Sequence, residues 1–173
     1  PDFATPWTIR REAINSLHKG RTFYTSNSGL LQLRSAISDY VYNHHKVRYH
    51  TEDEIIVTVG GSEAIDIAIR SMVDDGDEVL IVEPCFVCYA PLVQMSNGIP
   101  VIIETKVENN FKLTAEELKS KITDKTKLLI LPFPNNPTGA IMTHEDLQAI
   151  VDVLKDTNIV ILTDERYSEL TYG

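Results

Sequence analysis

The residues best suited to chemistry in this chain stand directly after short apolar stretches. Asp164 follows residues 159–163, and an ionised carboxylate at the end of such a stretch is costly unless it is paired. A protonated pyridine nitrogen is one suitable partner, because a carboxylate there helps a pyridine ring to act as an electron sink. A capping aspartate or an ion-paired aspartate would explain the same residue equally well. The position of Asp164 therefore indicates a site for a ring cation and leaves these alternatives open.

A second candidate group is Gly60-Gly61-Ser62, which lies between a β-branched run and a helical pattern. Glycines let the backbone approach a ligand, and the N–H groups at a helix N-terminus favour a phosphate. The alternative is an ordinary tight turn with Ser62 as the N-cap. Neither a complete GxGxxG motif nor a Walker lysine motif is present, which argues against a dinucleotide or a nucleoside triphosphate.

Three more residues could bind the rest of such a ligand. Asn136 could offer its amide to a phenolate oxygen, although an Asn-Pro turn has the same sequence. Tyr167 could donate its hydroxyl to the same oxygen. Phe86 could stack on a planar ring, although an aromatic residue there is more often part of a core. Together with Asp164, these groups suit a flat, phosphorylated pyridine that carries a phenolic oxygen.

The elements that must position these residues alternate between two periodicities. We expect five strands, at residues 55–59, 78–82, 100–104, 128–131 and 159–163. We expect helices at about 7–19, 30–45, 62–73, 86–96, 114–121 and 143–156, the last two opened by capping boxes. Apolar strands that alternate with helices predict an α/β fold: a mostly parallel sheet with helices on both faces. Ligands bind at the carboxyl ends of such strands, so the loops after four strands should converge there.

Composition excludes several classes of partner. The formal charge is −9, which argues against binding to nucleic acid or to an anionic membrane. No apolar run is long enough to predict a transmembrane helix, and no signal peptide pattern is present. Cys85 and Cys88 have C-x-x-C spacing, but the chain offers no second pair for a zinc site, so we expect two free, reduced cysteines in a cytoplasmic protein.

Taken together, these motifs resemble the class I and II aminotransferases of fold type I over essentially the whole chain. Within that family the chain is most similar to the bacterial Iγ subgroup, which acts on aspartate, aromatic amino acids, alanine or acetyl-diaminopimelate. The matching segments are Pro-Asp-Phe-x-Thr-Pro at residues 1–6, Tyr24-x4-Gly29-x4-Arg34, Gly60-Gly61-Ser62, Pro84-x-Phe86-x-x-Tyr89, Asn136-Pro137-Thr138-Gly139 and Asp164-Glu165-x-Tyr167-Ser168-Glu169.

The resemblance implies a cofactor and a role for each site residue. The cofactor would be pyridoxal 5′-phosphate, and the substrates an amino acid and a 2-oxo acid. The contacts implied are Gly61 and Ser62 with the phosphate, Gly60 in the turn, Phe86 on the ring, Asn136 and Tyr167 with the phenolate, and Asp164 with the ring nitrogen. Tyr24 would reach the phosphate in the neighbouring subunit of a homodimer. Residues 1–20 would form an arm leading to a small domain, and residues 21–173 the first part of the large cofactor-binding domain.

Two departures from the family pattern limit these expectations. The lysine that forms a Schiff base with the cofactor has no match here and would lie beyond Gly173, so we expect an internal fragment without transaminase activity of its own. Arg166 replaces the small or aliphatic residue expected between Glu165 and Tyr167. An arginine there could stack on the ring or block it, and blocking is the stronger expectation. A C–S lyase of the same fold and a non-catalytic binding module remain alternatives.

Overall fold

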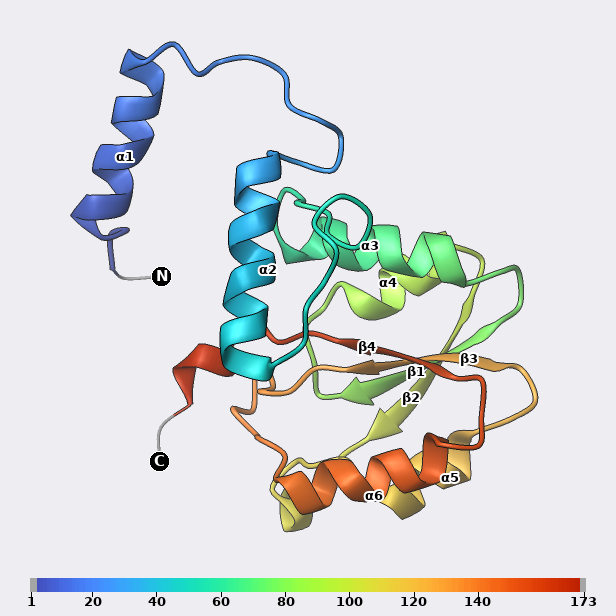
Figure 1. Ribbon diagram of the computed structural model, residues 1–173. Coiled ribbons are helices and arrows are strands. Elements are labelled where there is room, and N and C mark those ends of the chain that lie inside the picture. Colours follow the sequence, from blue (N-terminus) through green and yellow to red (C-terminus); the bar gives the residue numbers. More distant parts are fainter. Residues whose placement is uncertain (1–2, 172–173) are drawn as a thin grey trace. The chain divides into compact units, whose positions relative to one another are not determined.

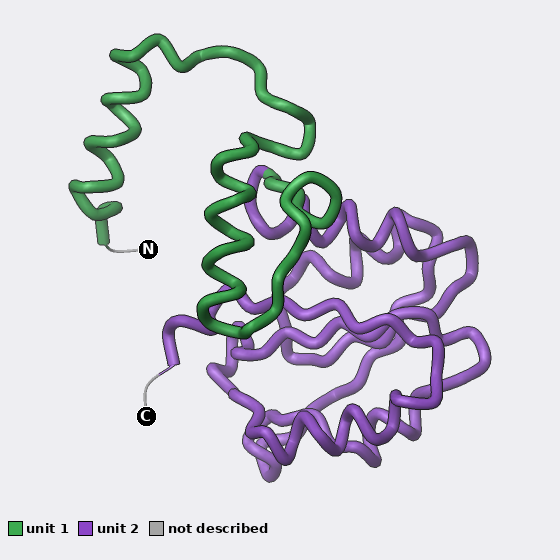
Figure 2. The backbone as a smooth tube through the Cα atoms, viewed as in Figure 1, with its two compact units in different colours: residues 1–58 green, residues 59–173 purple. Residues whose placement is uncertain are grey.

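The computed structural model describes residues 3–171, so Pro1, Asp2, Tyr172 and Gly173, which include the start of the first motif, lie outside the described residues. Backbone contacts divide the chain into two compact units, residues 1–58 and residues 59–173 (Figure 2). This division does not test the expected domain boundary at residue 20, which concerns the complete protein.

The unit of residues 59–173 is built on a four-stranded sheet in which all neighbouring strands are parallel. The strands are β1 (Glu78–Glu83), β2 (Ile99–Glu104), β3 (Thr126–Leu131) and β4 (Val160–Thr163), in the order β2-β1-β3-β4. In the register Leu80 lies opposite Leu129, and Leu129 lies opposite Ile161. Each of the two central strands, β1 and β3, has a run of four consecutive buried apolar residues, because both of their faces are covered. The predicted α/β class with a parallel sheet is confirmed.

Helices cover both faces of this sheet, two on each side (Figure 1). The helices are α3 (Gly61–Met72) and α4 (Tyr89–Met95) on one face, and α5 (Ala115–Lys121) and α6 (His144–Leu154) on the other. Two short 3-10 helices, η1 (Val107–Asn109) and η2 (Ser168–Leu170), lie in connecting segments. Both predicted capping boxes are present, at Thr114 and Thr143.

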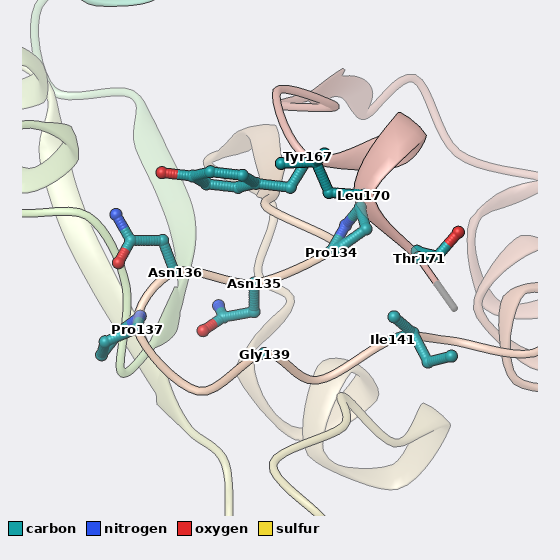
Figure 3. A pocket seen from close by; sticks show the side chains of 9 residues that line it. All are labelled: Pro134, Asn135, Asn136, Pro137, Gly139, Ile141, Tyr167, Leu170 and Thr171. Carbon is teal, nitrogen blue, oxygen red and sulfur yellow. The ribbon is translucent and has the colours of Figure 1, made fainter. Parts of the chain in front are cut away.

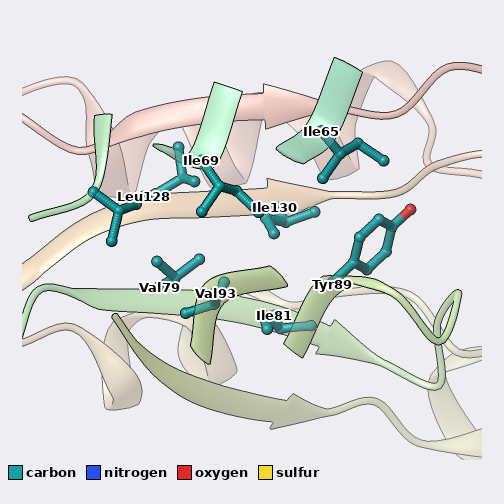
Figure 4. Close-up of a cluster of buried hydrophobic side chains, with 9 residues drawn as sticks. Ile65, Ile69, Val79, Ile81, Tyr89, Val93, Leu128 and Ile130 are labelled. Carbon is teal, nitrogen blue, oxygen red and sulfur yellow. The ribbon is translucent and has the colours of Figure 1, made fainter. Parts of the chain in front are cut away.

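Each face of the sheet has its own hydrophobic core, because successive side chains of a strand point to opposite faces. Val79 and Ile81 of β1 face α3 and α4, where they meet Ile69, Tyr89 and others (Figure 4). Leu80 and Val82 of β1 face α5 and α6, and the residues of β3 alternate in the same way. The sheet therefore separates two cores, and the Tyr89 ring belongs to the first of them.

The expected strand at residues 55–59 is wrong, because the sheet among the described residues has four strands and this segment is not one of them. The N–H of Val57 donates instead to the carbonyl of Ser28 at 3.0 Å. Gly29 allows this close approach: its φ is +96°, and a Cβ there would come within 2.6 Å of the Val57 Cβ. A β-branched run predicts extended backbone, but its partner is chosen by tertiary structure.

The unit of residues 1–58 contains α1 (Trp7–His18) and α2 (Leu31–His45). None of the α1 residues is buried. From α2, the buried Arg34 donates hydrogen bonds to the carbonyls of Thr51 and Glu52 at 2.8 and 3.1 Å, and Ser38 donates to the carbonyl of Tyr49 at 2.7 Å. These bonds attach the segment after α2 to that helix.

Candidate functional site

Four predicted site residues of the second unit lie in the segments after β1, β3 and β4: Phe86, Asn136, Asp164 and Tyr167. These strands are parallel, so the loops that leave their carboxyl ends start from the same edge of the sheet. The loop after β1 begins at Pro84, the loop after β3 at Pro132, and the segment after β4 at Asp164. Because α4 starts at Tyr89 rather than near residue 86, Phe86 lies in the first of these loops.

Asp164 is held by neutral donors from two directions. Its backbone N–H donates to the carbonyl of Leu131 at 3.2 Å, which fixes the main chain beside β3. The Tyr89 hydroxyl donates to its Oδ2 at 2.7 Å, and the N–H of Arg166 donates to its Oδ1 at 3.3 Å. Within residues 3–171 no cationic side chain forms an ion pair with this half-buried carboxylate.

A small hollow opens beside this carboxylate, and four of the predicted site residues line it: Phe86, Asn136, Asp164 and Tyr167. Tyr89 and Arg166 also line it. Its volume is about 20 Å³, whereas a cavity that holds a benzene ring measures ~150 Å³. The residue types suit a pyridinium with a phenolic oxygen, but the hollow is too small for the ring in this arrangement of the side chains.

A larger pocket adjoins this hollow and shares Asn136 and Tyr167 with it. It has a volume of about 440 Å³ and is lined mainly by the loop after β3 and by residues near η2. Figure 3 shows the Tyr167 ring lying over the Asn135–Asn136 segment, with the Tyr167 hydroxyl on the side of Asn136. Asn136 and Tyr167 therefore border both spaces.

Asn135, which is buried, organises the loop that carries Asn136. Its side-chain amide donates to the carbonyl of Pro84 at 3.1 Å, which joins the loop after β3 to the loop after β1. Its Oδ1 accepts from the N–H and the hydroxyl of Thr138 at 3.2 and 2.8 Å. The backbone of Asn135 bonds with Ala140 and Gly139, so the turn is closed on itself. This network fixes the neighbouring Asn136.

The residues predicted to bind a phosphate, Gly60, Gly61 and Ser62, lie at the N-terminus of α3. Gly60 is the N-cap with φ +82°, and a Cβ at Gly60 or Gly61 would meet nothing within 4 Å, so the backbone there is open to a ligand. Gly61 and Ser62 lie in the first turn, where a helix has no internal partner for its N–H groups. Ser62 lies close enough to Cys88 to lower the pKa of its thiol, against the larger effect of burial, so this helix end lies near the loop after β1. The alternative that Ser62 is the N-cap is wrong, because Gly60 holds that position.

Tyr24 lies in the other unit, and its side chain is fully exposed. The proposed contact of Tyr24 with a neighbouring subunit stays a prediction.

Burial governs the ionisation of the groups around the hollow. It is the main reason why the pKa of Cys85 is raised to about 11, with Glu83 adding to the effect, and why the pKa of Cys88 is raised. The pKa of Tyr89 is raised by burial first and by its hydrogen bond to Asp164 second, so its hydroxyl stays a donor at neutral pH. In the described part of the chain both cysteines are free, and no group of three His, Cys, Asp or Glu could hold a metal ion.

Sequence reasoning missed the roles of two residues in this region. Tyr89 enters the sequence analysis only as part of the Pro84-x-Phe86-x-x-Tyr89 motif, and Asn135 does not enter it, yet the first bonds Asp164 and the second orders the loop of Asn136. Their contacts join residues that are far apart in the chain, and no local pattern encodes such pairs. The sequence did contain one indication: Tyr89 stands three residues after Phe86, and Asn135 stands directly before Asn136, so each is close in sequence to a predicted ligand residue.

Among residues 3–171 no helix is both long enough and apolar enough to cross a membrane. The chain is similar to known proteins over its whole length. It is 46% identical over 172 residues to the putative aminotransferase YugH of Bacillus subtilis, covering 99% of this chain and 45% of that protein. The aromatic aminotransferase of Pyrococcus horikoshii superposes with a TM-score of 0.93 at 41% identity, over 95% of this chain and 44% of that chain.

An aspartate aminotransferase of Thermus thermophilus, crystallised with maleate, superposes with a TM-score of 0.94 at 34% identity, over 100% of this chain and 45% of that chain. The chain thus spans less than half the length of the relatives that it matches. Residues 1–173 match the family Aminotransferase class I and II. The fold is that of part of these enzymes, and the chain belongs to the class I and II aminotransferase family, in the group of the aspartate, aromatic and acetyl-diaminopimelate aminotransferases.

Proposed function

We propose that the complete protein is an aminotransferase that moves an amino group between an amino acid and a 2-oxo acid, and that this chain supplies most of its pyridoxal phosphate site. The observation that carries the proposal is Asp164: an acidic side chain at the end of β4 that lines a hollow with Asn136 and Tyr167 and has no cationic partner among the described residues. When bound, the cofactor would supply an electron sink for bond breaking at the amino-acid Cα.

Each site residue has a separate task in this proposal. Asp164 holds a proton at the ring nitrogen, because its carboxylate is the only acidic group that lines the hollow. Asn136 and Tyr167 donate hydrogen bonds to the phenolate oxygen. Phe86 covers one face of the ring and excludes water from it. The N–H groups of Gly61 and Ser62, shaped by the Gly60 turn, bind the phosphate.

The partners belong to the same proposal. The substrates would be an amino acid and a 2-oxo acid, and the complete enzyme a homodimer. Tyr24 supports the dimer, because an exposed tyrosine in the first unit is free to serve a neighbouring subunit.

A non-catalytic binding module is the second candidate, and one observation favours it. The hollow of about 20 Å³ is smaller than a pyridine ring, so the ring can enter only if side chains that line the hollow, such as Arg166 or Tyr167, move. Arg166 is exposed, and its guanidinium lies 5.7 Å from the centre of the Tyr167 ring, so it can turn without leaving a core position. The aminotransferase proposal therefore requires that the pyridine ring enters the hollow, whereas the non-catalytic module does not.

Titration of the chain with pyridoxamine 5′-phosphate tests the proposal, because this ligand needs no lysine. We expect binding by isothermal titration calorimetry, and a loss of affinity of about tenfold or more in Asp164→Asn, since a hydrogen bond to a charged group contributes ~1.5–3 kcal/mol. Asp124→Asn, in an exposed turn before β3, is the matched control and should bind like the unmodified chain. Absence of binding, or equal binding by Asp164→Asn, would overturn the proposed site.

A further inference from the structure

Tyr89 is the buried tyrosine of the core between the sheet and helices α3 and α4, and its hydroxyl forms a hydrogen bond. The Tyr89 side chain is 1% exposed and packs among Ile65, Ile81 and Ile130 (Figure 4). Its hydroxyl donates to Asp164 Oδ2 at 2.7 Å across 75 positions of the chain. A buried hydroxyl is costly without a partner, and the partner here is a site carboxylate rather than a backbone group.

Packing alone does not require this hydroxyl. A phenylalanine ring would fill the same space against α3 and the sheet, and would make the same edge contact with Phe86, whose ring centre lies 6.2 Å away. The hydroxyl adds a single contact, the one with Asp164. Its effect therefore falls on the carboxylate.

Each oxygen of the Asp164 carboxylate accepts one hydrogen bond, which leaves each of them able to accept another from a ligand. Oδ2 accepts from Tyr89, and Oδ1 accepts from the N–H of Arg166. Each carboxylate oxygen can accept about two hydrogen bonds, so one further donor can still be bound. Both present donors are neutral and leave the negative charge uncompensated. A carboxylate held in this way has a fixed orientation, and its negative charge still favours the binding of a cation.

We propose that Tyr89 is a positioning residue, whose hydroxyl orients the Asp164 carboxylate toward the ring nitrogen of a bound pyridinium ligand. This inference rests on the proposed cofactor site. Tyr89 lines the hollow, but in this proposal its hydroxyl bonds Asp164 and neither the ring nor the reacting atoms. Its effect must therefore depend on the ring nitrogen, which distinguishes it from a residue that only stabilises the fold.

The test compares two ligands in Tyr89→Phe: pyridoxamine 5′-phosphate and its 1-deaza analogue, in which a C–H replaces the ring nitrogen. We expect the Kd of pyridoxamine 5′-phosphate to rise about tenfold and the Kd of the analogue to stay unchanged, because the analogue makes no bond to Asp164. Tyr42→Phe removes a hydroxyl from an exposed ring in the other unit and should change neither value.

A double-mutant cycle adds a second readout. In an Asp164→Asn background, Tyr89→Phe should weaken pyridoxamine 5′-phosphate binding no further, since the group that it orients is gone. Circular dichroism checks that each variant is folded. Equal weakening for both ligands, or no weakening, would overturn the role of Tyr89 and leave the proposed site standing. Absence of binding by the unmodified chain would overturn both.

Discussion

Asp164 and Arg166 carry opposite charges at the same hollow, two residues apart, and do not pair. The Arg166 guanidinium lies near the Tyr167 ring, while its backbone N–H bonds Asp164. Because Arg166 lines the same hollow as Asp164, a cation that pairs with the carboxylate would lie close to this side chain. Ligand affinity at this site should depend on how easily that side chain moves.

Replacement of Arg166 by alanine tests whether the arginine blocks the hollow. We expect Arg166→Ala to bind pyridoxamine 5′-phosphate several-fold more tightly, because the ring no longer has to displace the side chain. Arg21→Ala, at an exposed position of the other unit, is the control for the loss of one positive charge. A weaker Kd in Arg166→Ala would mean that the guanidinium stacks on the ring instead.

The two cysteines should resist alkylation in the folded chain. The thiolate is the reactive form, and with a pKa of about 11 only about 0.1% of Cys85 is ionised at pH 8, against about a quarter for an ordinary cysteine. Reaction with iodoacetamide, followed by mass spectrometry, should be slow at pH 8 and accelerate toward pH 11. The same chain unfolded in urea is the control. Equal rates in both states would contradict the raised pKa.

At the scale of elements, the loop after β3 depends on one buried amide. Asn135→Ala removes the bond to Pro84 and both bonds from Thr138, and leaves a gap at a position where the side chain is buried. We expect the free energy of unfolding to fall by about 2–3 kcal/mol in urea titrations. Asn158→Ala, at an exposed position before β4, should change it by less than ~0.5 kcal/mol. An equally small change in Asn135→Ala would contradict the expectation that the bonds of Asn135 stabilise the fold.

Local patterns predicted the elements better than their partners. The strands of the sheet are runs of apolar residues, and both capping boxes are contiguous motifs, so their positions were predictable from the sequence. The segment at 55–59 has the same composition but bonds the loop at Ser28. The bond between Tyr89 and Asp164 was not predictable, because it depends on how β4 and α4 come together.

At the scale of the whole molecule, β4 leaves one edge of the sheet without a strand neighbour among the described residues. Val160 and Ile161 on this strand are 38% and 40% exposed. An apolar edge strand is a template for pairing with another chain, whereas the charge of −9 keeps molecules apart at low salt. These two effects act in opposite directions, and salt weakens only the second.

We therefore expect the chain to self-associate, and to do so more strongly as salt is raised from 10 mM to 300 mM, because the Debye length falls from ~30 Å to less than ~8 Å. Sedimentation velocity measures this. Ile161→Lys should reduce the association, while Gln148→Lys, on the exposed side of α6, should have a smaller effect. A monomer at high concentration and high salt would contradict the expectation.

The division of the interior into two cores also limits how the gene can change over evolutionary time. In β1 and β3, neighbouring residues belong to different cores, as Leu128 and Leu129 do. Substitution of one aliphatic residue by another keeps each side chain in its core. The gain or loss of a single codon would instead transfer the rest of the strand to the wrong core. Insertions and deletions among relatives should therefore fall in surface segments such as residues 105–112, and spare residues 78–83 and 126–131.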